Sequence, residues 1–168
     1  LLEGINWRTA TLYGWNEAGS SWTTLMSLDS AAEFLELPYN RVDDTITVKT
    51  DGEAVSGTRY LHQNELRGGV VDLGSSKFRT IMDNSSGIWR TQDTVKLPSL
   101  VIDGVDGTEP ANGLCDIWAP RLLGIASGVA NTYTKLKLVI DAQTTPDGYF
   151  TIGSVVIGRA HLLAHDYS

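Results

Sequence analysis

Hydrophobic and polar residues alternate with a period of two over much of the chain. In residues 135–141, Leu136, Leu138 and Ile140 share one face of an extended chain, and two lysines begin the other face. This period is typical of a β-strand, whose successive side chains point to opposite faces. We predict strands at this segment and at similar runs, which cover residues 7–13, 22–28, 45–49, 70–73, 78–82, 100–102 and 155–163.

Turn-forming residues separate these runs. Asn-Gly and Asp-Gly pairs supply the positive φ angles that tight turns require, and they stand at residues 51–52, 103–104, 106–107, 112–113 and 147–148. Many short strands separated in this way are typical of a sandwich or a barrel. We therefore predict an all-β, antiparallel protein. Its longest loop is expected at residues 103–112, and the second longest at residues 37–44.

Helix is expected to be scarce. Residues 29–37 begin with the capping residues Asp29 and Ser30, contain helix formers and stop at Pro38. This pattern predicts two helical turns at most, so the fold should hold no more than one or two short helices. Residues 121–130 are apolar but rich in small residues, which leaves them open between strand and loop.

The composition is that of a globular protein. The chain has 168 residues, 42% of them hydrophobic, which suffices for one domain with its own core. Thirteen Lys and Arg against twenty Asp and Glu give a net charge of −7. That charge repels phosphate backbones and anionic lipid, so we expect no nucleic-acid and no membrane partner. One cysteine excludes a disulfide framework. The start at Leu1 instead of Met leads us to expect a piece of a longer chain.

Two segments carry a resemblance to a known family. The alternating strand at residues 135–141 is followed by a turn and an aromatic-x-x-Ile-Gly-x-x-x-x-Gly run that ends at Gly158. Upstream, Asp72-Leu73-Gly74 closes an apolar strand. These segments resemble the closing hairpin and the Asp-Leu-Gly strand of galactose-binding-like (discoidin-type) jelly-roll domains. The resemblance implies an antiparallel β-sandwich of the jelly-roll type.

The order of segments departs from that family. Residues 10–16 and 21–25 resemble its paired strands, but here they precede the Asp-Leu-Gly element instead of following it. We expect one sandwich domain over residues 1–168. The alternative is that residues 1–60 belong partly to a neighbouring module and residues 61–168 form the jelly roll.

The carboxy-terminal residues 148–168 also resemble the ends of jelly-roll segments in tail and tail-tip proteins of tailed bacteriophages. This resemblance implies a non-enzymatic structural module of a phage tail or tail tip that mediates protein–protein assembly or contact with the host surface. Its partners would be neighbouring proteins, most simply further copies of the chain in a homo-oligomer. The alternative location is extracellular or on a bacterial surface.

The acidic loop offers one candidate metal site. Asp103, Asp106 and Glu109 bring three carboxylates into a short stretch, and hard cations such as Ca²⁺ prefer oxygen ligands. The spacing is not that of an EF-hand, and solvated turn carboxylates give the same pattern. If calcium binds here, we expect it to have a structural role. No other cofactor is expected.

No enzyme motif is present in the sequence. Cys115 has no base beside it in the sequence, and we expect a buried thiol. His161 and His165 would lie about 13 Å apart in a strand, too far to share a metal. Asp43 and Asp44 are adjacent, so in a strand they point to opposite faces. A polysaccharide hydrolase is retained only as the least favoured function.

Aromatic residues are the remaining candidates for ligand binding. Trp15, in a turn-like context, and Tyr39, after a proline, are expected to be exposed. Indole and phenol rings stack on the apolar faces of sugars, so a carbohydrate-binding module is the alternative function. The other four tryptophans are expected to fill the core: Trp7, Trp22, Trp89 and Trp118.

Overall fold

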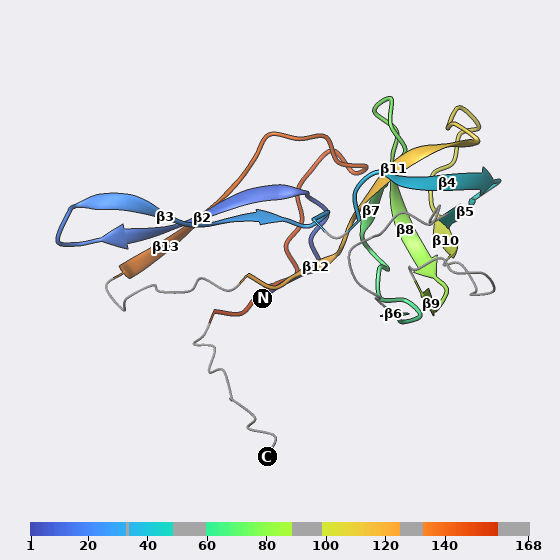
Figure 1. Ribbon diagram of the computed structural model, residues 1–168. Coiled ribbons are helices and arrows are strands. Elements are labelled where there is room, and N and C mark those ends of the chain that lie inside the picture. Colours follow the sequence, from blue (N-terminus) through green and yellow to red (C-terminus); the bar gives the residue numbers. More distant parts are fainter. Residues whose placement is uncertain (33, 49–59, 89–98, 125–132, 158–168) are drawn as a thin grey trace, which may run out of the picture.

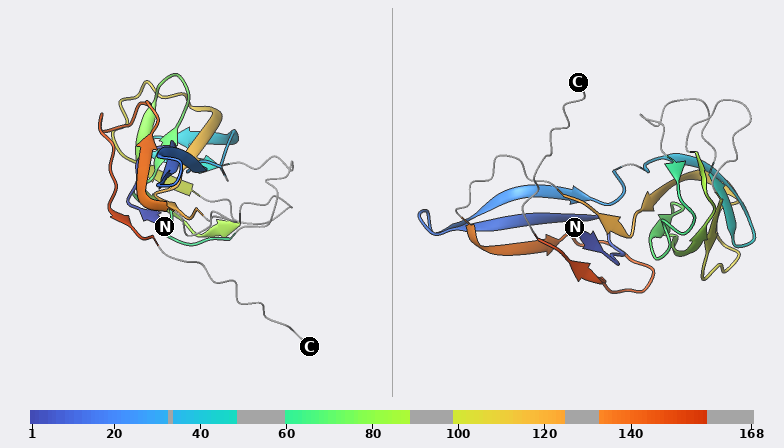
Figure 2. Two further views of the ribbon diagram at one scale, coloured as in Figure 1. Left: turned by 90° about the vertical axis from the view of Figure 1, so that its left-hand side faces the viewer. Right: turned by 90° about the horizontal axis from the view of Figure 1, so that it is seen from below.

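The computed structural model describes residues 1–32, 34–48, 60–88, 99–124 and 133–157. These parts form an elongated molecule with a β-barrel at one end and a three-stranded arm that projects from it (Figures 1 and 2). Every pairing between described strands is antiparallel, and none of the described residues is helical. The all-β antiparallel class is therefore confirmed. Accordingly, the described residues offer no long apolar helix of the kind that crosses a bilayer.

Six strands close the barrel. Their order around it is β10-β5-β4-β11-β7-β8, and β8 pairs again with β10. This closure leaves each barrel strand with a neighbour on both sides, which removes exposed edges. The two stacked sheets of a jelly-roll sandwich are not confirmed. The strand bounds are β4 (Leu37–Val42), β5 (Thr45–Val48), β7 (Val70–Asp72), β8 (Phe78–Asn84), β10 (Ser99–Ile102) and β11 (Asn112–Trp118).

Alternate residues of the barrel strands fill its interior. Ile46 and Val48 of β5 point inward, as do Leu100 and Ile102 of β10, and all four are buried. The period of two in the sequence therefore translates into a core face and an outer face. Loop residues such as Leu66 complete the interior cluster.

The arm consists of β2 (Thr9–Asn16), β3 (Ser21–Asp29) and β13 (Tyr133–Ile140), in the order β13-β2-β3. The turn at residues 17–20 joins β2 to β3 at the end far from the barrel (Figure 1). Near the barrel, the base of the arm packs on a second core. Its buried members are Leu2, Ile5, Trp7, Ala10 and Leu28.

Two small sheets of short strands complete the described fold. β1 (Leu2–Glu3) lies between β12 (Arg121–Leu122) and β14 (Ser154–Val155) beside the arm, and β6 (Tyr60–Leu61) pairs with β9 (Gly87–Ile88) below the barrel (Figure 1). A third buried cluster consists of Ala31, Val70 of β7 and Trp118 of β11, and it is separate from the cluster in the barrel interior. The tilted rings of Phe78 and Trp118, 5.3 Å apart, belong to it.

The helix predicted at residues 29–37 is wrong. The described residues there form turns, in which the Asp29 carboxylate accepts the Ala31 N–H and the Ser30 hydroxyl donates to the Trp7 carbonyl. Phe34 and Leu37 are buried in the barrel interior, so packing overrides the local helix preference. The loop predicted at residues 37–44 is also wrong, because β4 occupies most of it.

The predicted closing hairpin does not form either. β13 pairs with β2, and the segment after it contributes only β14, which pairs with β1. The strand predicted at residues 155–163 thus reaches only Val155 within the described chain, and residues 158–163 lie outside it. The long loop predicted at residues 103–112 is confirmed, since it joins β10 to β11.

Candidate functional site

One face of the arm gathers three aromatic side chains and two lysines. Trp15 of β2 lies opposite Trp22 of β3, with ring centroids 5.4 Å apart in an edge-to-face arrangement. The Lys137 Nζ lies 4.8 Å from the Tyr13 ring centroid and 4.6 Å from that of Trp22, and Lys135 Nζ lies 5.8 Å from that of Trp15. We call Tyr13, Trp15, Trp22, Lys135 and Lys137 the aromatic–lysine face.

Strand register explains this grouping. Lys137 lies directly opposite Tyr13, and both lysines occupy the alternate positions of β13 that face away from Leu136 and Leu138. A cation above an aromatic ring is attracted to the ring's negative face. Both lysine residues are exposed, and neither makes an ion pair with another described residue. The charge of Lys135 contributes to the lowered pKa of the nearby Glu17 carboxyl, whereas Lys137 has no carboxylate partner among the described residues.

Side-chain hydrogen bonds hold the turn next to this face. The Asn16 side-chain oxygen accepts the backbone N–H groups of Ala18 and Gly19. The Thr134 hydroxyl donates to Glu17 over 2.7 Å, which lowers the pKa of the Glu17 carboxyl below its ordinary value. The turn is thereby tied both to itself and to β13.

The opposite face of the arm is apolar and closely packed near its end. A side chain on Gly14 would overlap the Tyr133 ring, since its Cβ would lie 2.5 Å from a ring carbon. The same Cβ would lie 3.1 Å from Leu25. Gly14 thus lets the Tyr133 ring lie against the β2 backbone.

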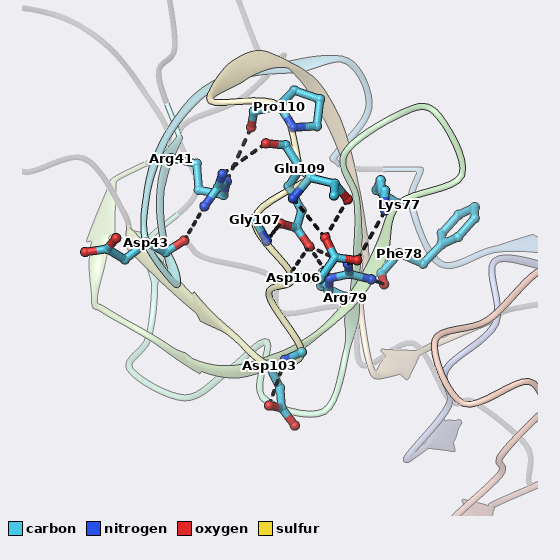
Figure 3. A network of polar contacts seen from close by, with 12 residues as sticks. Arg41, Asp43, Lys77, Phe78, Arg79, Asp103, Asp106, Gly107, Glu109 and Pro110 are labelled. Carbon is cyan, nitrogen blue, oxygen red and sulfur yellow. Dashed lines mark hydrogen bonds and ion pairs between the residues drawn. The ribbon is translucent and has the colours of Figure 1, made fainter.

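A second candidate lies in the loop between β10 and β11 (Figure 3). The Glu109 side chain is fully buried and accepts hydrogen bonds from Arg79 and from the backbone N–H groups of Asp106 and Gly107. Burial alone would raise the pKa of Glu109, but these N–H groups and the Arg79 charge outweigh it and lower the pKa. Asp106 lies 3.2 Å from Arg79 and 3.3 Å from Lys77.

The three predicted calcium ligands are only partly brought together. Asp106 and Glu109 share Arg79 as a partner, and the Thr108 hydroxyl and N–H hold the pKa of Asp106 well below its usual range. Asp103 lies apart from them in Figure 3, where it accepts the Gly104 N–H. Among the described residues, no group of three His, Cys, Asp or Glu side chains is placed to hold a metal ion. The calcium site stays a prediction.

A third cluster lies where the arm meets the barrel. Arg8 donates to Asp116 at 2.9 Å and lies 3.4 Å from Asp29. Asp116 and Asp72 are cross-strand neighbours on β11 and β7, and burial together with the Asp116 charge raises the pKa of Asp72. The second Asp116 oxygen accepts the Glu36 N–H. With both its oxygens engaged, Asp116 links the arm to the barrel.

Two expectations about aromatic exposure are wrong. Tyr39 is 2% exposed in the barrel interior, because it follows Pro38 inside strand β4 and its hydroxyl donates to the Pro110 carbonyl. Trp22 is not a core residue but 39% exposed on the arm. Trp15 is half-buried, and Trp7 and Trp118 are buried as predicted.

The remaining candidates divide in the same way. Cys115 is buried in the barrel interior, as expected, and burial raises the pKa of its thiol to about 12. Trp89, His161 and His165 lie outside the described residues.

The aromatic–lysine face is not evident from the sequence. The alternation at residues 135–141 places both lysines on one side, but only the pairing of β13 with β2 brings them onto the aromatic rings. Comparison with known proteins gives no match to any family, to any curated protein or to any solved structure.

Proposed function

We propose that this chain is a non-enzymatic assembly module that joins copies of itself through the projecting arm. The observation that carries the proposal is the pairing of the arm strands. Among the described strands, β3 and β13 pair with β2 alone, so each leaves an outer edge along the arm. Free backbone groups on a strand edge are a template for pairing with another chain.

The exposure of the arm supports the same role. Residues 21–24 of β3 and 134–137 of β13 are exposed. Among them, the apolar residue Leu136 is 42% exposed. A sheet gains its stability from burying at least one face. Apart from the contact between Gly14 and the Tyr133 ring, much of the outer half of the arm stays exposed within one copy, and a neighbouring copy would cover it.

The resemblance of residues 148–168 to phage tail proteins suggests where such an assembly module would act. Tail and tail-tip modules are repeated in the virion, where copies of one chain contact each other in a symmetric arrangement. We propose the phage particle as the location and further copies of the chain as the partners. A jelly-roll sandwich is not required for this function, because a barrel presents an arm equally well.

Sedimentation velocity of the full chain over a range of concentrations tests the proposal. We expect reversible association beyond the monomer, and we expect Trp22→Ser to weaken it at least about tenfold. The matched control is Leu114→Ser, which removes an apolar side chain that is 57% exposed on the barrel, and association should be unchanged. A protein that remains monomeric at every concentration would contradict the proposal.

Carbohydrate binding is the second candidate, because Trp15 and Trp22 are partly exposed on one face. Glycan-array binding that is lost with Trp15→Ala would favour it over assembly. The lysine side chains count against it, since their ammonium groups already occupy positions over these rings. Assembly is therefore the function proposed first.

A further inference from the structure

We propose that the aromatic–lysine face of one copy docks on the acidic end of the barrel of the next copy. This inference rests on the proposed assembly function and names the surface that the arm contacts. The acidic end of the barrel consists of Val42, Asp43, Asp44 and Asp103. Both surfaces belong to the same chain, so the contact is head to tail.

The acidic end is formed by the turn between β4 and β5 and by the adjacent start of the loop that follows β10. The Ile102 N–H donates to the Asp44 carbonyl over 2.9 Å, which brings Asp103 next to that turn. All three aspartates are exposed, and none makes an ion pair with another described residue. The acidic end therefore carries three carboxylates that have no ion-pair partner among the described residues.

The nearest guanidinium does not neutralise these carboxylates. Arg41 donates to the backbone carbonyls of Asp43, Glu109 and Pro110, with donor–acceptor distances of 2.6 Å, 2.9 Å and 3.4 Å (Figure 3). These bonds fix the turn against the neighbouring loop and leave the Asp43 carboxylate free. The acidic end is thus held in shape before any partner arrives, which reduces the entropy lost on binding.

The two surfaces match in charge and in apolar character. The aromatic–lysine face holds two of the chain's five lysines, although the net charge of the chain is −7. Val42, 72% exposed, offers an apolar side chain beside the aspartates, and the exposed part of the Trp22 indole, which Lys137 does not cover, can pack on it. Opposite charges around an apolar contact favour one partner and one orientation.

The shape of the molecule makes this contact intermolecular. The arm turn and the β4–β5 turn lie at opposite ends of the long axis in Figures 1 and 2. The two surfaces of one copy are therefore too far apart to meet. Contacts between unlike surfaces build a ring when the rotation closes and a filament when it does not.

Two double variants, each of which replaces two charged side chains by neutral amides, test the contact. The arm variant is Lys135→Gln with Lys137→Gln, and the barrel variant is Asp43→Asn with Asp44→Asn. Asparagine suits the positive φ of 52° at Asp43 as well as aspartate does. The control, Asp141→Asn with Glu36→Gln, removes two negative charges from exposed positions elsewhere. Urea unfolding verifies that all three variants fold like the unchanged protein.

Sedimentation velocity near 50 mM NaCl then reads the assembly directly. We expect species larger than a dimer for the unchanged protein and the control, and monomers for each double variant alone. An equimolar mixture of the two double variants should form dimers and nothing larger, because each variant keeps one intact surface. Raising NaCl to about 500 mM should weaken assembly at least about tenfold, since salt screens exposed charges.

Other results overturn the inference in distinguishable ways. If the barrel variant assembles like the unchanged protein, the head-to-tail contact is wrong and the assembly function stands. If the unchanged protein is monomeric throughout, the assembly function fails as well. In that case, binding of an anionic polysaccharide such as alginate that is lost in the arm variant would assign the aromatic–lysine face to acidic sugars.

Discussion

The barrel and the arm are made from similar alternating sequences, yet they bury them to different extents. In the barrel, Ile46, Ile81 and Leu100 are completely buried. In the arm, Leu136 and Val139 keep 42% and 40% of their surface exposed. The difference arises because the barrel closes on itself, whereas the arm has two outer strands. Alternation thus determines that a segment is a strand, and the closure of the sheet determines how far its apolar side chains are buried.

A matched pair of truncations tests most directly whether buried barrel side chains stabilise the fold more than arm side chains do. Leu100→Ala in the barrel should lower the free energy of unfolding by about 3 kcal/mol, because it leaves a cavity in a closed core. Leu136→Ala in the arm should cost less than about 1 kcal/mol, because much of that side chain already contacts water. Urea unfolding measures both. Equal losses in the free energy of unfolding would contradict this difference, because they would mean that Leu136 is as well covered in solution as Leu100.

The buried ion pair of the barrel is the next largest effect. Glu109→Gln leaves the exposed Asp106 as the only described carboxylate that pairs with Arg79, and we expect a loss of about 2 kcal/mol in the free energy of unfolding. Asp103→Asn, in the same loop, should change it by less than about 0.5 kcal/mol, because that carboxylate is exposed. Thermal and urea unfolding would both register the difference. Equal effects would contradict the structural role of Glu109.

The same carboxylate makes the barrel sensitive to acid. The pKa of Glu109 lies below its ordinary value of 4.5 in the folded protein. Its ionised form therefore stabilises the fold above pH 4.5, and this contribution is lost as the pH falls from there towards the folded pKa. The stability gap between the unchanged protein and Glu109→Gln should narrow as the pH drops from about 6 to about 3. A gap independent of pH would refute this assignment.

A smaller effect is expected from crowding within the arm. Gly14→Ala places a Cβ 2.5 Å from the Tyr133 ring, so the ring must move, at a cost of about 1 kcal/mol. Hydrogen exchange should become faster in β2 and β13 while the barrel amides keep their protection. The control is Gly19→Ala, because the nearest atom to a Cβ at that position would be the Ser21 hydroxyl oxygen, 3.3 Å away. Faster exchange throughout the barrel would show that the two regions open together.

The smallest effect concerns the lysine above the aromatic rings. Lys137→Ala removes the cation from Tyr13 and Trp22 and should cost about 0.5 kcal/mol in the free energy of unfolding. Tryptophan fluorescence should change as the indole ring loses its neighbour. Lys137→Arg keeps a cation at this position and should preserve both quantities. An unchanged free energy of unfolding in the alanine variant would mean that the contact of Lys137 with the rings does not stabilise the fold.

Strands were more predictable from the sequence than their partners. The runs at residues 22–28, 45–49 and 78–82 fall within or close to β3, β5 and β8, because alternation is a local property. The pairing of β13 with β2 joins residues more than a hundred positions apart, and the alternation of neither strand specifies it. For this reason, the prediction that β13 forms a hairpin with the segment after it was wrong.

The sites show the same division between local and non-local information. The Asp72 side chain accepts the Gly74 N–H at a strand end, a contact that turn chemistry alone predicts. Tyr39 is expected to be accessible because a proline precedes it, but Pro38 lies inside β4, and the alternation of that strand places Tyr39 on its buried face with Leu37. Glu109 looked like a solvated turn carboxylate, and only its contact with Arg79, thirty residues away, reveals its burial.

The position of the barrel within the sequence has a consequence for how the chain folds. All six barrel strands lie between β3 and β13, so the arm is interrupted by the whole barrel. During synthesis, the β2–β3 hairpin emerges before the barrel strands, and β13 is made only after all of them. Folding the barrel brings the distant segment close and shortens the loop that must be closed. We expect completion of the arm to be the late step of folding, with the free edge of β2 open to exchange with another nascent chain until then.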